Sequence, residues 1–482
     1  RVRYIGRVER SPGYFVSHAP GNECPEGSSK ITTISGCWEA VAWASPPRFR
    51  AQGTESSKNW PSGCYFCDDV DECMDGTWFN LHPRGKAHGG ARPYCKGKAS
   101  ADGTRYFAWP GTQIEARFTG TSISANLTGS YSGDRFVALI DGKPQKPFHT
   151  SKHFKGWQNY ELASGLTDDD HTLALWKITE DLIQHHLHGA CRFGSLFVDG
   201  HFLDLHAPRK RRLEFIGDSD TAGYCADGSP SSGGNEVMTQ NTFKTWAAQL
   251  ARDLSADFVA LAISGDGVEE RTARDIGKRA SLPDLFDNTC PFQNPWSGSG
   301  SAWNFSAYVP DAVIMLIGPN DDDGQDLRDS YMQMMNKIVF NYAHAPMPPK
   351  IISVIAGSGN GFDPADDIKL ITDEFNSGRS DGFTAYYTSM RRTTWDQINA
   401  NNGKSQYNGC HAHYNEKGHA KVVAEILPQV EQIMGWASPA RLYEGHSAGG
   451  WGTSAYTFKG RDHSHLTKAL IIAILAMLAL GL

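Results

Sequence analysis

Near residue 208 the chain changes its hydrophobic pattern, and this change constrains the fold more than any other feature of the sequence. From about residue 104 to 206, short runs such as Ile114–Phe118 and Ile123–Leu127 alternate apolar with polar side chains. Turn signals end two further runs of this kind, since Asp141-Gly142 follows Phe136–Ile140 and Asp199-Gly200 follows Ser195–Val198. Several short strands at this spacing are typical of an all-β sandwich or jelly roll, which we predict for residues 103–207.

After residue 208 the pattern is that of strands alternating with helices. Apolar runs rich in Val and Ile indicate buried strands at Leu213–Ile216, Phe258–Ile263, Ala312–Ile317 and Ile351–Ile355. Helical patterns cover Phe243–Leu254, Asp329–Tyr342 and Lys417–Met434. Buried strands that alternate with helices form a parallel sheet with helices on its faces. We therefore predict an α/β domain over residues 208–436.

Six of the ten cysteines lie in the first 95 residues, and such a cluster indicates disulfides and an oxidising compartment. They are Cys24, Cys37, Cys64, Cys67, Cys73 and Cys95. A zinc site at Cys64-x-x-Cys67 with Cys73 is the alternative, but no second cysteine pair completes it. The sequence does not choose among the disulfide connectivities. Two sequons, at Asn126 and Asn304, agree with secretion and mark both residues as glycosylation candidates.

Charge and the end of the sequence bear on the partners of the chain. With 46 Lys and Arg against 53 Asp and Glu, the net charge of −7 gives no general affinity for nucleic acid. A Gly-, Ser- and Thr-rich linker over residues 437–467 precedes a hydrophobic tail over residues 468–482. Its apolar run, residues 469–482, is shorter than the roughly 20 residues of a spanning helix. We predict membrane attachment through this run, either as the tail of a lipid-anchor signal or as a short membrane anchor.

Small and polar residues follow the predicted strands of the α/β domain. Ser219 follows the first strand in Gly217-Asp218-Ser219, Gly265 follows the second strand, and Asn320 follows the third. His413 precedes the last predicted helix. Ligands of open α/β sheets bind at the carboxyl ends of the strands. A serine, a histidine base, a glycine N–H and an asparagine amide are together the parts of an acyl-transfer site.

Each of these motifs also has a purely structural interpretation. Gly217-Asp218-Ser219 is compatible with an ordinary capped turn, and Asn320-Asp321 with an Asx turn. His411, His413 and His419 suggest a metal, yet their spacings of two and six residues do not form a helical ligand pair. We therefore predict no metal, and acyl transfer of this kind requires no cofactor.

Longer stretches of the sequence resemble the SGNH, or GDSL-type, hydrolases, and within them carbohydrate esterase family 2. The matching stretches are Arg3–Glu9, Phe107–Thr121, Ile140–Pro144, Leu175–Glu180 and Lys210–Ser219. The resemblance covers residues 1–11 and about 104–436 of the chain. It implies an N-terminal jelly roll and a flavodoxin-like SGNH catalytic domain. Residues 1–11 then belong to the jelly roll, and residues 12–102 are a Cys-rich insertion within it.

The resemblance implies a role for each strand-end residue. Ser219 is the nucleophile and His413 is its general base. The oxyanion hole consists of the backbone N–H groups of Ser219 and Gly265 together with the side chain of Asn320. The implied reaction is hydrolysis of acetyl esters on polysaccharides or oligosaccharides, outside the cell or at its surface. Supporting positions are Asp218, Thr221 and His411.

The sequence departs from the family's pattern at three positions. His411 stands where family members usually carry the Asp that orients the catalytic histidine, Tyr414 replaces Pro, and Asp220 replaces Ile. In a serine triad the loss of that carboxylate costs about 10⁴ in rate. Either a backbone carbonyl accepts the Nδ1–H of His413 or an acid elsewhere does so, and the sequence leaves both open.

These departures keep other functions under consideration. His411 and Asp220 favour a catalytically impaired SGNH-fold protein that binds carbohydrate. An SGNH esterase or lipase of another substrate class is the second alternative, although the jelly roll counts against it.

Four cysteines lie outside the N-terminal cluster, at Cys191, Cys225, Cys290 and Cys410. Cys290 and Cys410 fall near the implied catalytic loops, and we predict a disulfide between them.

Overall fold

The structure is a computed structural model. It describes residues 2–10, 14–16, 21–24, 28–34, 36–37, 40, 51–67, 76–96, 104–130, 133–151, 157–180, 191–232, 236–269, 271–273, 277–279, 281–291, 302–321, 325–355 and 364–436. The predicted linker and hydrophobic tail, like Cys73, lie outside the described residues. Among the helices that are described, none is long and apolar enough to cross a membrane.

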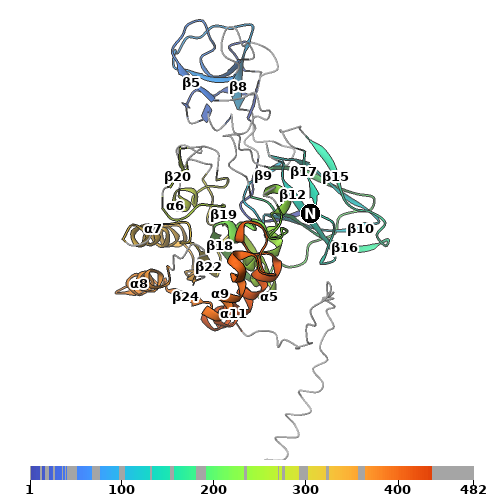
Figure 1. Ribbon diagram of the computed structural model, residues 1–482. Helices are drawn as coiled ribbons and strands as arrows, with labels where there is room; N and C mark the ends of the chain where they lie inside the picture. The colour runs from blue at the N-terminus through green and yellow to red at the C-terminus, as the bar shows by residue number, and fades with distance from the viewer. Residues whose placement is uncertain are drawn as a thin grey trace, which may run out of the picture. The chain divides into compact units, whose positions relative to one another are not determined.

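Two antiparallel sheets form a β-sandwich, as the alternating pattern predicts (Figure 1). The first has the strand order β1 (Val2–Ile5), β10 (Gln113–Gly120), β16 (Asp169–Lys177), β12 (Arg135–Ile140) and β13 (Lys143–Pro144), with β14 (Phe148–His149) paired to β12. The second has the order β15 (Gln158–Ala163), β11 (Ile123–Thr128), β17 (Cys191–Val198), β9 (Arg105–Phe107) and β2 (Glu9–Arg10). Phe118 of the first sheet shares a core with Ile123 and Leu127 of the second. Burial of these alternating apolar faces holds the sheets together.

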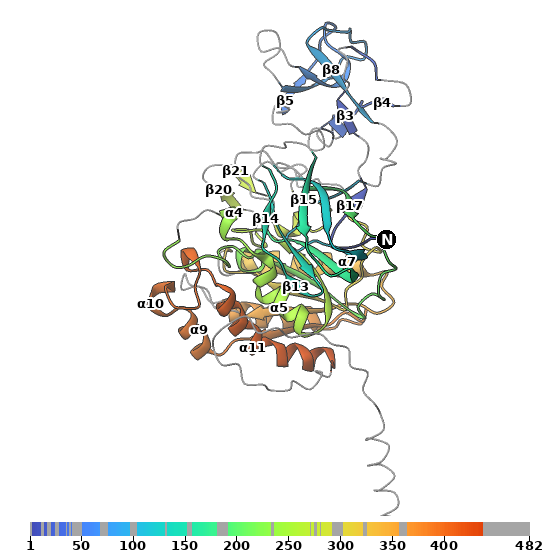
Figure 2. The same cartoon turned by 90° about the vertical axis from the view of Figure 1, so that its right-hand side faces the viewer.

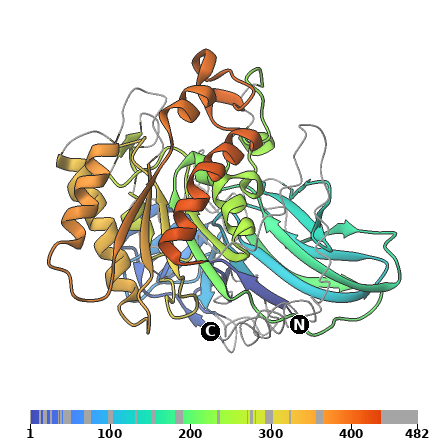
Figure 3. The same cartoon turned by 90° about the horizontal axis from the view of Figure 1, so that it is seen from below.

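Five parallel strands form the sheet of the α/β domain. Their order is β19 (Ala256–Ala262), β18 (Arg211–Gly217), β22 (Ala312–Leu316), β23 (Lys350–Ile355) and β24 (Ala385–Ser389). One face packs with α5 (Trp246–Asp253) and α11 (Glu416–Met434), and the other with α7 (Gln325–Tyr342) and α8 (Ala365–Asn376) (Figure 3). The predicted two-part fold, a β-sandwich followed by an α/β domain, is therefore confirmed.

Short helices and one hairpin complete the α/β domain. They are α3 (Ser219–Ala222), α4 (Glu236–Thr239), the 3₁₀ turn η1 (Thr242–Lys244), the hairpin β20 (Arg271–Ala273) and β21 (Gly277–Arg279), α6 (Leu282–Leu285), α9 (Arg392–Ile398), α10 (Ala400–Gly403) and the 3₁₀ turn η2 (Cys410–Ala412). Of these, α3 begins at the candidate nucleophile Ser219, and η2 directly precedes the candidate base His413.

Arg7 connects the N-terminal segment of the chain with the α/β domain. Its guanidinium is fully buried and donates hydrogen bonds to the carbonyl oxygens of Phe286 and Asn288, the latter at 2.9 Å. It also pairs with the Glu214 carboxylate of β18 at 3.2 Å. A buried charge needs such partners. The segment that precedes the cysteine cluster is therefore anchored in the same body as the parallel sheet.

The residues between β2 and β9 form a small sheet of their own (Figure 2). Its strand order is β3 (Tyr14–Val16), β8 (Ala91–Lys96), β6 (Gly63–Cys67), β7 (Gly76–Asn80) and β5 (Ala51–Glu55), with β4 (Ser29–Lys30) paired to β8. Its described residues include the disulfides Cys24–Cys95 and Cys37–Cys64, and Cys67 is disulfide-bonded as well. β2 pairs directly with β9, where Arg10 lies opposite Arg105. The chain thus leaves and re-enters the sandwich at adjacent positions.

The predicted disulfide between Cys290 and Cys410 is wrong. Cys410 is bonded to Cys225, and their Cα atoms are 5.2 Å apart. Cys290 is instead buried beside Tyr106 of the sandwich, and like Cys191 it carries a thiol rather than a disulfide. A bridge requires Cα atoms about 4.4–6.8 Å apart, and nearness to the catalytic loops in the sequence does not supply that separation.

Candidate active site

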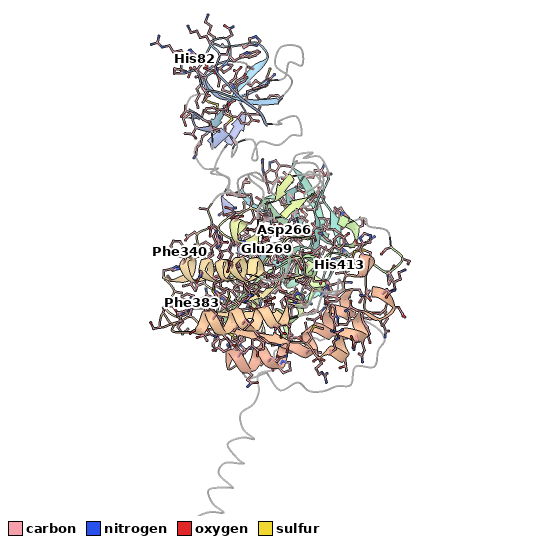
Figure 4. The ribbon with its side chains drawn as sticks, turned by 60° about the vertical axis from the view of Figure 1, so that its left-hand side comes forward. His82, Asp266, Glu269, Phe340, Phe383 and His413 are labelled. Atoms are coloured by element: carbon pink, nitrogen blue, oxygen red, sulfur yellow. A yellow bond between two sulfur atoms is a disulfide. The ribbon has the colours of Figure 1, made fainter. Side chains whose placement is uncertain are left out.

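Polar groups from separate segments meet at the carboxyl edge of the parallel sheet. Ser219 follows β18, Asp266 follows β19, Asn320 follows β22, and His413 precedes α11. Hydrogen bonds join these segments in pairs, between His413 and Ser219 and between Asn320 and Asp266. Figure 4 labels His413 and Asp266 among the side chains of this body. The structure therefore brings the predicted site residues of these segments to one place, the usual ligand position in open α/β sheets.

Ser219 opens helix α3 directly after β18. Asp218 caps this helix, because its carboxylate accepts the N–H of Asp220 at 3.1 Å. Gly217 has no room for a side chain, since a Cβ atom there would lie 2.1 Å from Thr221 Oγ1. Ser219 is only 8 % exposed. The strand-to-helix turn thus presents the serine hydroxyl at a nearly enclosed position.

His413 connects the serine to a backbone carbonyl. Its Nε2 lies 2.8 Å from Ser219 Oγ, and its Nδ1 lies 3.0 Å from the carbonyl oxygen of His411. A carbonyl oxygen only accepts hydrogen bonds, so Nδ1 carries the proton and Nε2 is left to accept the serine hydroxyl. Of the two arrangements that the sequence leaves open, this is the one in which a backbone carbonyl orients the imidazole.

The loop that supplies this carbonyl is held by contacts with Tyr224 and Cys225, which follow the serine helix α3. His411 has a φ of 51°, a left-handed conformation that costs energy for a residue other than glycine. Tyr224 lies 2.8 Å from His411 Nδ1 through its hydroxyl, and its ring meets that of His413 edge-on with centroids 4.7 Å apart. The disulfide between Cys225 and Cys410 ties the loop to the turn after α3. These contacts hold the carbonyl where the imidazole needs it.

Two buried carboxyl groups border the serine. Burial raises the pKa of Asp218 well above its usual value, and the charges of Asp220 and Asp321 raise it further. Burial also raises the pKa of Asp220 above its usual value, and the charge of His413 and the N–H of Tyr414 offset that rise only in part. Both carboxyl groups beside the serine therefore hold a proton more readily than a free aspartate does.

Asn320 lies at the site, but its amide is engaged within the protein. Its Nδ2 donates to Asp218 Oδ2 and to the carbonyl oxygen of Asp266, each at 3.1 Å. An amide has two N–H groups, so both are used. Gly265, the other predicted oxyanion residue of this region, has a φ of 81°, which favours glycine. The contacts of Asn320 thus fix the loop that carries Gly265 against the serine turn.

Glu180 is a site residue that the motifs do not reveal. It follows β16 of the sandwich, and its carboxylate accepts the backbone N–H of Ser264 at 2.6 Å and also the Ser264 hydroxyl. Gln240 donates to the same carboxylate and accepts the Glu180 N–H at 2.9 Å. Ser264 directly precedes Gly265. The only signal in the sequence is a charged residue after an apolar strand. This signal does not predict a contact with Ser264, which lies 84 residues further along the chain.

The remaining predicted positions have other surroundings. Thr221 is fully buried under the serine turn. Asn126 lies on β11 and donates a hydrogen bond to Asn159 at 2.7 Å. Asn304 is exposed, and its side chain accepts the N–H of Ser306 at 3.1 Å. Glycosylation at these two asparagines stays a prediction.

Two family models match the chain. The model of the carbohydrate esterase 2 N-terminal region matches residues 97–205, and that of the GDSL-like lipase/acylhydrolase family matches residues 215–421. The chain thus joins a carbohydrate esterase 2 N-terminal region to a GDSL-like lipase/acylhydrolase domain. The first match falls on the β-sandwich, and the second covers the parallel sheet with Ser219 and His413.

Named proteins that resemble this chain include a cellulase/esterase and two acetylxylan esterase / glucomannan deacetylases. Cellulase/esterase CelE of Acetivibrio thermocellus is 29 % identical over 297 residues, which are 58 % of this chain and 34 % of that protein. An acetylxylan esterase / glucomannan deacetylase of Cellvibrio japonicus is 23 % identical over 342 residues, 70 % of this chain and 86 % of that protein. The chain thus spans about a third of the length of the first relative and most of the second.

Solved structures share the fold of the chain. A family two carbohydrate esterase from Clostridium thermocellum, solved in complex with cellohexaose, has a TM-score of 0.56 at 24 % identity. The match covers 69 % of this chain and 95 % of that one. A family two carbohydrate esterase from Cellvibrio japonicus has a TM-score of 0.55 at 20 % identity, over 70 % of this chain and 93 % of that one.

Proposed function

We propose that the chain is a serine esterase that hydrolyses acetyl esters on polysaccharides or oligosaccharides. The observation that carries this proposal is the hydrogen-bonded series from Ser219 Oγ to His413 Nε2, and from His413 Nδ1 to the carbonyl of His411. A nucleophile, a base within hydrogen-bond reach and a group that orients the base are the parts of nucleophilic ester hydrolysis. The match of residues 97–205 to the carbohydrate esterase 2 N-terminal region supports the substrate class.

In the first half of the reaction, His413 accepts the proton of Ser219 while Oγ attacks the acetyl carbonyl carbon. The negative charge that forms on the acetyl oxygen is stabilised by the backbone N–H groups of Ser219 and Gly265. Asn320 adds a third donor when one of its two N–H groups turns from Asp218 or Asp266 to the oxyanion. His413 then returns the proton to the departing sugar oxygen, which leaves an acetyl group on Ser219.

In the second half, water replaces the sugar. His413 takes a proton from the water as its oxygen attacks the acetyl-serine, and the same donors stabilise the second tetrahedral oxyanion. Collapse of that intermediate returns the proton to Ser219 Oγ and releases acetate. At both stages the carbonyl of His411 keeps the imidazole in the tautomer that can accept a proton at Nε2.

The similar proteins and the disulfides support a proposal for the substrate and the place of action. Two relatives are named acetylxylan esterase / glucomannan deacetylase, and we propose acetylated polysaccharides of these kinds as substrates. Disulfides persist in oxidising compartments, which supports an extracellular or cell-surface enzyme. Anchorage through residues 469–482 belongs to the same proposal.

Acetate release tests the proposal. The purified chain should release acetate from acetylated xylan and from p-nitrophenyl acetate, and Ser219→Ala and His413→Ala should each abolish the release. Ser380→Ala and His344→Ala change the same residue types at exposed positions and should keep full activity. Equal acetate release by Ser219→Ala would refute the proposed chemistry. A preference for long-chain over acetyl p-nitrophenyl esters would favour a lipase instead.

A further inference from the structure

The β-sandwich has one face that packs on the α/β domain and one face that is exposed to solvent. On the first sheet, Trp176 of β16 stacks on Phe258 of β19, with ring centroids 5.4 Å apart. On the second sheet, Phe197 of β17 is exposed, and Trp157, directly before β15, has 44 % of its surface exposed. The outer face of the second sheet is therefore the side of the sandwich on which a bulky external group has room.

Trp157 shares this outer face with Asn126, the first residue of the sequon Asn126-Leu127-Thr128. Asn126 of β11 lies opposite Asn159 of β15, and its Nδ2 donates a hydrogen bond to Asn159 Oδ1 at 2.7 Å. Trp157 comes two residues before Asn159, and residues two apart in an extended chain point to the same face of a sheet. The indole ring and the sequon amide therefore lie on one surface.

Gly194 brings the two groups close to each other. A bulge in the ladder of β11 with β17 places two residues of β17 opposite Asn126, and Gly194 is one of them. A Cβ atom at Gly194 would lie 2.9 Å from Asn126 Oδ1 and 3.2 Å from a ring carbon of Trp157. The amide and the indole ring thus approach the same point of the sheet, where glycine adds no side chain of its own.

We propose that Asn126 carries an N-linked glycan whose first sugar, an N-acetylglucosamine, packs on the indole ring of Trp157. A pyranose presents C–H groups on its face, and these pack on the negative face of an aromatic ring while the hydroxyl groups stay in solvent. The sequon supplies the attachment point, and the disulfides indicate an oxidising compartment of the kind in which such glycans are added. The inference does not depend on the proposed esterase function.

The chemistry of the transfer leaves the contact of the amide with Asn159 in place. A transferase takes one proton from Asn126 Nδ2, which bonds to the anomeric carbon of a lipid diphosphate oligosaccharide. The bond from that carbon to the diphosphate breaks, and the lipid diphosphate leaves with its electron pair. Because an amide has two N–H groups, one remains to donate to Asn159 Oδ1. This hydrogen bond therefore orients the first sugar beside Trp157.

The second sequon has different surroundings and serves as an internal reference. Asn304 is exposed, and its Oδ1 accepts the N–H of Ser306 at 3.1 Å. The neighbouring aromatic ring, that of Trp303, faces the Arg7 guanidinium, which lies 5.6 Å from the ring centroid. A glycan on Asn304 would therefore be independent of Trp157.

Secretion of the full chain from a eukaryotic host tests the attachment. Peptide N-glycosidase F converts a glycosylated asparagine to aspartate, and mass spectrometry of peptides then reports the occupancy of each sequon. We expect most molecules to carry a glycan on Asn126, and Asn126→Gln should remove that glycan without changing the occupancy of Asn304. Unmodified Asn126 in the secreted protein would overturn the inference.

The rate at which the folded protein loses the glycan tests the packing on the ring. Trp157→Ala should speed enzymatic release from Asn126 severalfold, because the bond to the first sugar is then more accessible, and should leave release from Asn304 unchanged. Phe340→Ala is the matched control, since Phe340 of α7 is 81 % exposed, and it should change neither rate. Equal release from Asn126 in the wild type and in Trp157→Ala would refute the packing.

Melting temperatures give a second measurement of the same contact. In glycosylated protein, the effects of Asn126→Gln and Trp157→Ala should be non-additive by about 2 °C, because each variant removes the same sugar–ring contact. In protein from the bacterial periplasm, which lacks the glycan but forms disulfides, the two effects should add. Should Trp157→Ala not be secreted, Trp157→Leu keeps an apolar side chain without a ring. Equal coupling in both preparations would assign the effect to the two side chains alone and overturn the role of the sugar.

Discussion

Glu180 allows the sharpest test of how the sandwich contributes to the site, through the substitution Glu180→Ala. The side chain is 4 % exposed, and three donors point at its carboxylate: the N–H and hydroxyl of Ser264 and the amide of Gln240. A buried donor left without its partner costs about 1–3 kcal/mol, so the variant should lose about 3 kcal/mol or more of unfolding free energy.

The effect on catalysis should exceed what lower stability explains. Ser264 directly precedes Gly265, whose N–H is the proposed oxyanion donor. Loss of one such donor costs about 10²–10³ in kcat. If the Ser264 segment moves once Glu180 is gone, kcat for p-nitrophenyl acetate should fall by about a hundredfold with little change in KM.

The assay pairs urea unfolding, followed by tryptophan fluorescence, with steady-state kinetics well below the unfolding midpoint. Glu161→Ala is the matched control, because Glu161 is an exposed glutamate of the same sandwich that also accepts a serine hydroxyl, that of Ser164 at 2.9 Å. It should change neither quantity. A folded Glu180→Ala enzyme with unchanged kcat would show that Glu180 serves stability alone, and the reasoning about the oxyanion loop would be wrong.

Three further expectations concern the histidine loop. Cys225→Ser opens the disulfide with Cys410, which spans 185 residues of sequence. Because closing a loop of this size is worth up to about 5 kcal/mol, the variant should lower the urea midpoint, and it should lower kcat as well. An unchanged kcat would show that the histidine loop keeps its position without the disulfide. Tyr224→Phe removes the hydroxyl contact with His411 and should lower kcat severalfold at constant KM, whereas equal kinetics would assign that contact no role. Burial and the charge of His413 lower the pKa of His419 from 6.5 to about 3, so stability is complete above pH 6.5 and is lost as the pH falls below it. That loss should approach about 1.4 kcal/mol per pH unit, and His419→Gln should flatten it in urea titrations between about pH 7 and about pH 5.

The sequence predicts the fold well because the two kinds of hydrophobic period belong to two kinds of sheet. The alternation at Ile114–Phe118 indicates a strand with one face buried, and the continuous apolar run at Ala312–Ile317 indicates a strand with both faces buried. The meeting of Ser219 and His413 is predicted for the same reason, since parallel strands end at one edge whatever their separation in the chain.

What the sequence misses depends on contacts between distant segments. No local pattern states that Glu180 reaches Ser264, because the hydrogen bond exists only after the sandwich has packed on the sheet. The carbonyl that orients His413 is available because His411 adopts a left-handed conformation, which the surrounding loop imposes rather than the residue itself. The Cys290–Cys410 prediction fails in the same way, because a disulfide needs a specific distance between Cα atoms.

The pairing of Arg10 with Arg105 has a consequence for how this body can change over evolution or by engineering. The strands β2 and β9 flank the inserted residues and are hydrogen-bonded to each other. This strand pairing, and not the inserted residues, therefore holds the two ends of the insertion together. The entropy of closing a loop grows only with the logarithm of its length, so a long module costs little more there than a short turn. The junction between β2 and β9 is therefore a place at which whole modules can be exchanged while the sandwich and the α/β domain keep their fold.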